Sequence, residues 1–357
     1  MPNNIDFFSS YYMAGVVQEI VPPATFFRDR YFPTDPVKDI FAANKVLVEY
    51  RDGDRMLAPF VVARKGDVLI DRKGYEVHEY EAPMVAPSRL LTLDDLKKRG
   101  FGEALYAGST QAERAAALQL RDLTELEERI TRREEWLAAQ TMINNGFTAV
   151  EMIDDKEKVE SFSVVYYDVD KGNPAQYAVN VEWDNGGDFW KDVQTMCEDL
   201  ADRGLPATDL VVGTEVAHFI LEDEKAVKRL DNRRMEFGNI APKNLTAGVT
   251  WLGRLNFGGF ELDIYVVRET YVDDEGSIQR YFPTKSAMVT APNSGRMMYA
   301  QITQIEPDNE FHTFALRRVP KFVVDRDKDT RKLRLATRPL AAPNHKAPWM
   351  YAPNVLK

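Results

Sequence analysis

The stretch STQAERAAALQLRDLTELEERITRREEWLAAQTMINNG, residues 109–146, carries the strongest helical pattern in the chain. Its apolar stripe consists of Leu120, Leu123, Leu126, Ile130, Leu137 and Met142. Thr110 and Glu113 have the spacing of a capping box, and Gly146 is suited to a left-handed cap. The pattern predicts a helix over residues 109–145, which at about 1.5 Å per residue is roughly 50 Å long.

A helix of this length predicts the shape of the subunit. A compact domain of the whole chain's length has a radius of gyration of roughly 20 Å, so the helix would span about the full width of an elongated, flat molecule. Arg133 and Gln140 interrupt the neighbouring stripe, which disfavours a coiled coil. The other faces of the helix carry Glu125, Glu127, Glu128, Arg129, Arg132, Arg133, Glu134 and Glu135.

A second unusual stretch is APFVVARKGDVLIDRKGYEVHEYEAPMVAP, residues 58–87, which reads as two extended strands with turns at 65–67 and 71–74. It is rich in charge and poor in large apolar residues. Ten extended residues reach roughly 33 Å, and an isolated two-stranded hairpin is marginal in water. The sequence therefore predicts that this pair packs against a partner, in this chain or in another.

Residues 1–36 contain many aromatic residues but little sustained periodicity. The aromatic residues are Phe7, Phe8, Tyr11, Tyr12, Phe26, Phe27, Tyr31 and Phe32. Such a segment suits an arm that binds along another surface, for example that of a neighbouring subunit. The alternative is that these side chains dock on the chain's own core, and the sequence leaves both open.

The rest of the chain mixes strands and helices without a regular βαβ alternation, which predicts an α+β fold. Strands are expected at 45–50, 159–168, 178–183, 209–213, 262–268, 286–290, 296–306, 311–321 and 332–338. Helices are expected at 188–203 and from Thr214 onward. Residues 271–283, YVDDEGSIQRYFP, are predicted to form a hairpin with its turn at 273–276.

The composition is that of a soluble globular protein. The formal net charge of −10 argues against a general nucleic-acid surface, because phosphate contacts need clustered lysine and arginine. The single cysteine, Cys197, excludes an intrachain disulfide framework, as expected in a reducing compartment. No apolar run reaches the roughly 18 residues of a membrane span, and the first residues lack a signal-peptide pattern, so we expect synthesis in a cytoplasm.

The sequence contains no recognised catalytic or cofactor-binding motif. Its histidines, at positions 78, 218, 312 and 345, show no metal-ligand spacing. Phosphate-binding glycine motifs are absent, and Gly258-Gly259 precedes a strand, which predicts a turn. Cys197 follows the core-facing Met196 on a predicted helix, which favours a buried thiol over a nucleophile. We therefore expect no catalytic residue, no cofactor and no metal, and a structural protein in place of an enzyme.

Three segments share their pattern and order with one known family. They are residues 26–35 (FFRDRYFPTD), residues 208–234 (TDLVVGTEVAHFILEDEKAVKRLDNRR) and residues 258–289 (GGFELDIYVVRETYVDDEGSIQRYFPTKSAMV). Each pattern is loose, but their order and spacing are more specific, and residues 331–355 suit the closing strand of the same family. The chain resembles the major capsid protein E family of tailed phages, the lambda-type shell proteins.

This resemblance implies the fold shared by tailed-phage and herpesvirus shells. The expected parts are an N-terminal arm (1–40), an extended loop with flanking strands (41–100), a peripheral domain with the long spine helix (101–175), an axial domain (176–300) and returning C-terminal strands (301–357). Residues 58–87 would then pack on the next subunit, which would supply their missing partner.

The resemblance also implies partners. Hexamers and pentamers of the chain would form an icosahedral shell around double-stranded DNA, which the acidic chain would contact only weakly. Scaffold, portal and often decoration proteins would join it, and no membrane would be involved. The protein would be found in the virion after assembly in the host cytoplasm.

The expected inter-subunit contacts lie on the arm, the extended loop and the long helix. They are Phe26, Phe27, Arg64, Lys65, Asp67, Asp71, Arg72, Lys73, Arg132 and Arg133. The loop charges would set register more than affinity. Some shells of this fold form Lys–Asn isopeptide links from this loop, which makes Lys65 and Lys73 candidates, although the sequence places no asparagine or glutamate partner.

Two other classes of protein remain open at this stage. An encapsulin-like compartment shares the fold and would enclose a cargo enzyme in place of a long genome. A soluble enzyme with an unrecognised site would instead be a monomer with a substrate-sized pocket.

Overall fold

A computed structural model describes residues 24–50, 76–92, 111–152, 158–229, 243–246, 248–325 and 330–357. Several expectations fall outside these ranges: residues 1–23 of the arm, the turns at 65–67 and 71–74, Thr110 of the capping box, and the loop residues Arg64, Lys65, Asp67, Asp71, Arg72 and Lys73. Within the described ranges, no helix combines the length and the apolar character that crossing a membrane requires.

The chain divides into two compact units, which we describe separately. Unit 1 comprises Met1–Val46, Glu81–Ala139 and Arg296–Ala341. Unit 2 comprises Leu47–Tyr80, Gln140–Gly295 and Ala342–Lys357. Each unit draws on segments that are far apart in the sequence, so neither corresponds to one continuous stretch of chain.

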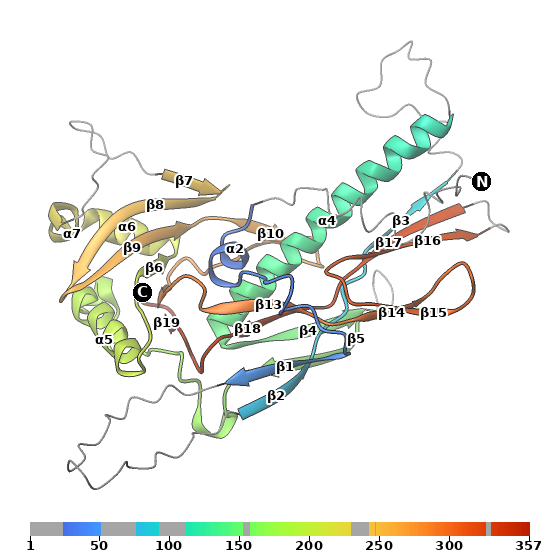
Figure 1. Cartoon of the computed structure of the whole chain (residues 1–357). Coiled ribbons are helices and arrows are strands. Elements are labelled where there is room, and N and C mark those ends of the chain that lie inside the picture. Colours follow the sequence, from blue (N-terminus) through green and yellow to red (C-terminus); the bar gives the residue numbers. More distant parts are fainter. Residues whose placement is uncertain are drawn as a thin grey trace, which may run out of the picture. The chain divides into compact units, whose positions relative to one another are not determined.

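Unit 1 is built along the helix α4 (Gln111–Asn144), whose 34 residues confirm the long helix predicted from the sequence (Figure 1). Its stripe residues Leu123, Leu126 and Ile130 are buried, whereas Leu120 is exposed. They pack against Leu333 and Leu335 of an antiparallel sheet. The strands of this sheet are, in spatial order, β16 (Val319–Asp325), β17 (Thr330–Ala336) and β3 (Ser88–Leu91).

The smaller elements of unit 1 extend this core. The short helix α2 (Phe27–Tyr31) follows the arm, and β14 (Ile302–Ile305) and β15 (Phe311–Phe314) form an antiparallel hairpin. Ile302 and Phe314 of this hairpin are buried with Val319 and Ala336. A further two-stranded sheet pairs β13 (Gly295–Tyr299) with β18 (Pro339–Pro343).

Unit 2 contains a six-stranded sheet. In spatial order its strands are β19 (Met350–Ala352), β12 (Ala287–Thr290), β6 (Asp209–Val212), β9 (Phe260–Val267), β8 (Val249–Phe257) and β7 (Lys243–Thr246). β6 and β9 run parallel, while the other neighbours are antiparallel. A mixed sheet without repeated βαβ units is typical of the predicted α+β class.

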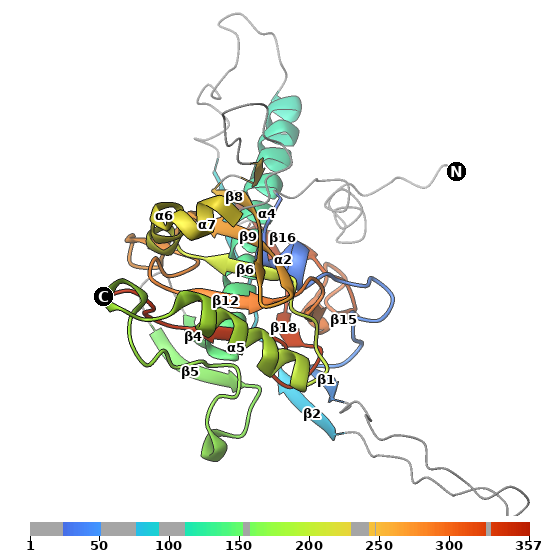
Figure 2. The same ribbon diagram turned by 90° about the vertical axis from the view of Figure 1, so that its left-hand side faces the viewer.

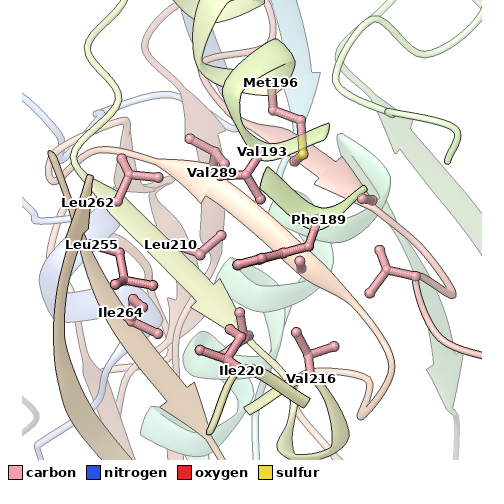
Figure 3. Close-up of a cluster of buried hydrophobic side chains, with 14 of the residues drawn as sticks. Phe189, Val193, Met196, Leu210, Val216, Ile220, Leu255, Leu262, Ile264 and Val289 are labelled. Atoms are coloured by element: carbon pink, nitrogen blue, oxygen red, sulfur yellow. The ribbon is translucent and has the colours of Figure 1, made fainter. Parts of the chain in front are cut away.

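Two helices cover one face of this sheet. The side chains between the helices and the sheet form the main core of unit 2 (Figure 3). Alternate strand residues such as Leu210 and Ile264 point into it, as expected for a half-covered sheet. Phe189 and Val193 come from α5 (Phe189–Asp202), and Ile220 comes from α6 (Thr214–Glu222). Asp188 caps α5 by accepting a hydrogen bond from the Lys191 N–H. The short helix α7 (Glu224–Arg229) follows α6.

Three two-stranded pairs complete the described chain. β1 (Lys45–Tyr50) pairs with β2 (Glu76–Glu81), as Figure 2 shows. β4 (Gly146–Met152) pairs with β5 (Lys158–Val165), and β10 (Thr270–Val272) pairs with β11 (Ile278–Arg280). Short 3-10 turns lie at η1 (Val169–Lys171) and η2 (Trp183–Asn185).

The strand predicted at 178–183 is wrong. This segment is held by separate bonds to the C-terminal chain: the Tyr177 N–H donates to Tyr351 O and the Trp183 N–H donates to Val355 O, each at 2.8 Å. The only strand-like pairing nearby is an isolated bridge between Gln176 and Tyr351. Residues 178–183 thus lie along the C-terminal chain without the continuous backbone hydrogen bonds of a strand. The single strands expected at 296–306 and 311–321 are each divided in two.

Candidate assembly surfaces and a buried charge cluster

Helix α4 carries three carboxylates that the sequence analysis assigned to its polar faces but that the structure buries. They are Glu127, Glu134 and Glu135, each at most 3% exposed. Around them lie Arg28, Tyr299, Arg317 and Arg318. We call these seven residues the charge cluster; all of them belong to unit 1. Buried charges of this kind are stable only when they are paired and hydrogen-bonded.

Glu134 is the centre of the charge cluster. Its Oε1 accepts hydrogen bonds from Arg318 Nη1 at 2.6 Å and from the Tyr299 hydroxyl at 2.9 Å. Its Oε2 accepts from Arg28 Nη1 at 3.0 Å and from Arg317 Nη2 at 3.4 Å. Arg318 also donates from Nε to Glu127 Oε2 at 2.5 Å. One carboxylate thereby joins α2, β13 and the β15–β16 connection to the long helix.

Glu135 fixes the start of α2. Its carboxylate accepts hydrogen bonds from the backbone N–H groups of Phe26, Phe27 and Arg28, at 3.0, 2.7 and 2.8 Å. These donors have no partner within a short helix, so a carboxylate from α4 takes the role that a capping side chain would normally fill. The chain is therefore anchored to the long helix immediately after the arm.

The charges within the charge cluster balance, with three carboxylates against three guanidinium groups. Burial by itself would raise the pKa of Glu134, but the surrounding guanidinium groups, Arg318 foremost, outweigh it and hold this pKa at about 2. Burial and the Glu134 carboxylate raise the pKa of Tyr299 to about 12. With these pKa values Glu134 stays ionised and Tyr299 stays protonated near neutral pH, which suits a structural anchor and not proton transfer.

Two residues expected to contact a neighbouring subunit lie in the chain's own core. Phe26 and Phe27 are 3% and 1% exposed, and Phe26 packs edge-to-face on Tyr31 with ring centroids 5.5 Å apart. The structure therefore shows the second alternative for this part of the arm: its aromatic side chains dock on the chain's own core. The backbone N–H groups of Phe26 and Phe27 are bonded to Glu135, and almost none of the surface of these two residues is accessible to a partner.

Arg132 and Arg133 lie on the accessible side of α4. The Arg132 side chain is 57% exposed and donates to Glu128 Oε2 at 3.0 Å. The Arg133 guanidinium lies 5.3 Å from the ring centre of Trp136. Both are placed where a neighbouring subunit could reach them, so their role as contacts remains a prediction, as does that of the six loop residues.

Exposed apolar residues lie near one another on three sheets, as direct cross-strand pairs on two of them. Val272 faces Ile278 on the β10–β11 hairpin, and Ile305 faces Phe311 on the β14–β15 hairpin. On the β16–β17–β3 sheet, the exposed Val323 and Leu90 lie on either side of Lys332. Clustered apolar surface of this kind is typical of sites that contact other proteins.

Two other groups could in principle carry chemistry. Cys197 is buried, and burial with the nearby Glu198 raises its thiol pKa to about 12, so it is the inert core thiol that the sequence predicts. Asp308, Glu310 and His312 place their ligand atoms within 4.8 Å of one another. Asp308 and Glu310 lie on the exposed turn between β14 and β15, and His312 lies on β15, with its Nε2 2.7 Å from Asp308 Oδ2. Such surface groups are common without an ion.

In the described part of the chain, the charged groups that are buried serve as anchors, while apolar pairs are left on the surface. These features define a structural subunit that acts by association. The sequence profile of the phage major capsid protein E family matches residues 9–352. The chain belongs to this family and is a structural capsid protein of a phage, not an enzyme.

Solved structures support the same fold. The putative capsid protein of a prophage from E. coli CFT073 is 12% identical, with a TM-score of 0.57 over 96% of this chain and 98% of that one. A phage-related protein from Bordetella bronchiseptica RB50 is 12% identical, with a TM-score of 0.51 over 97% of each chain. A comparison with curated proteins gave no match. The predicted family and shell fold are therefore confirmed, while the five domain boundaries remain predictions.

Proposed function

We propose that the chain self-assembles into hexamers and pentamers that close into an icosahedral shell around the double-stranded DNA of a tailed phage. The family match over residues 9–352 carries this proposal. In it, residues 58–87 pack on the next subunit, while the charge cluster anchors the root of the arm to α4. A standard protein interface buries about 1,600 Å², and each subunit would make several.

The remaining partners follow from the same proposal. A scaffold protein, a portal and, in some phages, a decoration protein bind the shell, and assembly takes place in the host cytoplasm before the chain becomes part of the virion. The net charge of −10 supports weak, non-specific contact with the packaged DNA, since strong contact needs clustered basic residues. Lys65 and Lys73 are the candidate lysines if the shell forms Lys–Asn crosslinks between subunits.

Electron microscopy of the purified chain tests the proposal. After size-exclusion chromatography at several concentrations, negative staining should show closed shells, or capsomer rings that grow into tubes and shells. The chain should also be co-expressed with the scaffold gene of its phage, because some shells need one. A monomer under all these conditions would contradict the proposal.

The content of the particles separates the two kinds of shell. A genome container made during infection should protect a long double-stranded DNA from nuclease. An encapsulin-like compartment should instead contain a cargo enzyme and no long DNA. Protein and nucleic acid recovered from nuclease-treated particles distinguish these outcomes.

A further inference from the structure

The β10–β11 hairpin presents an apolar pair beside an acidic turn. Val272 and Ile278 are direct cross-strand neighbours, yet they are 65% and 75% exposed. Between them the turn carries Asp273, Asp274 and Glu275. Asp273 organises this turn by accepting hydrogen bonds from the Glu275 and Ser277 N–H groups at 3.0 and 2.8 Å. The carboxylates of Asp274 and Glu275 are exposed.

This hairpin is a poor candidate for a surface that only faces water. It has three residues in each strand, and a two-stranded hairpin is marginal on its own. Its apolar pair contributes little burial within unit 2, because both side chains are mostly exposed. With one arginine, Arg280, the hairpin has a net charge of −2. A matching partner would therefore offer apolar surface surrounded by positive charge.

The outer face of the β16–β17–β3 sheet has that character. Its inner face is buried against α4, and residues of opposite parity point to the outer face. One end of this outer face, at Val319 and Ala336, is covered by the β14–β15 hairpin, so the accessible part is the other end. Val323, Lys332 and Leu90 are neighbours across the three strands, and the two apolar side chains are 42% and 57% exposed.

Lys321 and Arg334 form the next cross-strand pair on this face, and Arg334 donates a hydrogen bond to Gln304 Oε1 of β14 at 2.9 Å. One carboxylate of the sheet, Asp325, shares the face, and Glu306 of the β14–β15 hairpin lies close enough to interact with Lys321 and Arg334. Three basic and two acidic groups leave the face a net charge of +1.

We propose that the β10–β11 hairpin of one copy docks on the outer face of the β16–β17–β3 sheet of a second copy. Val272 and Ile278 would cover Val323 and Leu90, while the acidic turn would lie near Lys332. Opposite charge on the two surfaces supports this choice of partner and would set the orientation. This contact rests on the proposed function and adds a specific interface to it.

The geometry of such a contact has a consequence for assembly. The two surfaces are different patches of the same chain, so the interface is heterologous. Heterologous contacts generate closed rings when the rotation between copies closes. The inference thus names two surfaces that join neighbouring copies around a ring.

Charge reversal tests the contact. The variant Asp274→Lys/Glu275→Lys should raise the protein concentration needed for assembly by about tenfold or more, because like charges would then meet across the interface. Lys332→Glu should act in the same direction. The chain that carries all three changes should recover assembly at least in part. Asp273 is kept, because its side chain holds the turn.

A matched control carries Asp170→Lys/Glu222→Lys. It reverses two exposed carboxylates of unit 2 outside the hairpin, and it should assemble like the unaltered chain. If the hairpin variant assembles as well as this control, the inference is wrong while the proposed function stands. If neither the unaltered chain nor the control assembles, with or without scaffold, the proposed function fails and the inference fails with it.

Disulfide trapping tests the same contact without relying on a loss of assembly. Cys197 is buried, so cysteines introduced at Ser277 and at Leu90 are the reactive ones. A mixture of Ser277→Cys and Leu90→Cys chains should give a covalent dimer under mild oxidation in the assembled state, several-fold above either chain alone. Equal yields in the mixture and in the separate chains would overturn the proposal.

Discussion

We expect the stability of unit 1 to depend strongly on Glu134, because this buried carboxylate is bonded to four other side chains. Glu134→Gln keeps the shape of the side chain but leaves Arg28 and Arg318 without their shared counter-charge. Removing one partner of a buried ion pair typically costs about 3–5 kcal/mol. We expect a loss of that size in the free energy of unfolding, measured by denaturant titration of the unassembled chain.

The control for this variant is Glu128→Gln on the same helix. Glu128 pairs with Arg132 at 3.0 Å, but its side chain is 42% exposed, and exposed pairs contribute roughly 0–1 kcal/mol. Its unfolding midpoint should move little. Equal effects of the two substitutions would show that the charge cluster does not stabilise the fold.

The charge cluster also predicts how stability depends on pH. The pKa of Glu134 is lowered from 4.5 to about 2. A lowered carboxyl pKa contributes stability that is fully present above the unfolded value and is lost as the pH falls through the folded value. Stability should therefore fall between about pH 4.5 and pH 2, by about 3 kcal/mol from this residue. In Glu134→Gln this acid-dependent loss should be smaller; an unchanged pH profile would refute the assignment.

Cys197 predicts a chemical property of the folded chain. A thiol with its pKa raised from 9.0 to about 12 has roughly a thousandfold less thiolate near neutral pH, and its burial also blocks access. A thiol reagent should therefore label the folded chain very slowly and the denatured chain rapidly. Rapid labelling under native conditions would show that α5 does not shield this side chain.

At the residue scale, sequence patterns identify apolar stripes more reliably than buried charges. Glu127 and Glu134 are seven residues apart, so they lie on one side of α4, and that spacing was a signal. Their partners are distant in the chain: Arg28 is 106 residues from Glu134 and Arg318 is 184 residues away. The spacing alone does not decide burial, because the partly exposed Glu128 is also seven residues from the buried Glu135.

At the element scale, the sequence predicted the helices and strands whose formation depends on periodicity and caps within the element itself. α4 and α5 follow from helical periodicity and caps, and the strand at Lys45–Tyr50 was predicted with its exact bounds. The strand β8 was missed because Gly253, where its register shifts, breaks the alternation. The segment 178–183 was predicted as a strand because the sequence cannot show that its backbone partners lie in the C-terminal chain.

Under the proposed function, removal of the extended loop should separate folding from assembly. β1 and β2 pair with each other, so residues 52–74 connect two neighbouring strands. Replacing these residues with a short glycine–serine linker should leave the unfolding midpoint of the unassembled chain nearly unchanged, because the entropy of closing a loop changes only slowly with its length. The variant should fail to form regular shells in negative stain. Regular shells from it would show that the loop is not an assembly element.

At the scale of the whole molecule, assembly should stabilise every subunit, because a partner that binds only the folded state shifts unfolding by mass action. Assembled particles should unfold about 5 °C or more above the unassembled chain, and the difference should grow with protein concentration. The loop-replacement variant should lack this increment at every concentration, while it matches the unassembled chain in far-ultraviolet circular dichroism. Scanning calorimetry of the particles, the unassembled chain and the loop-replacement variant tests this prediction. Equal unfolding temperatures for the particles and the unassembled chain would mean that contacts between subunits do not stabilise the folded chain.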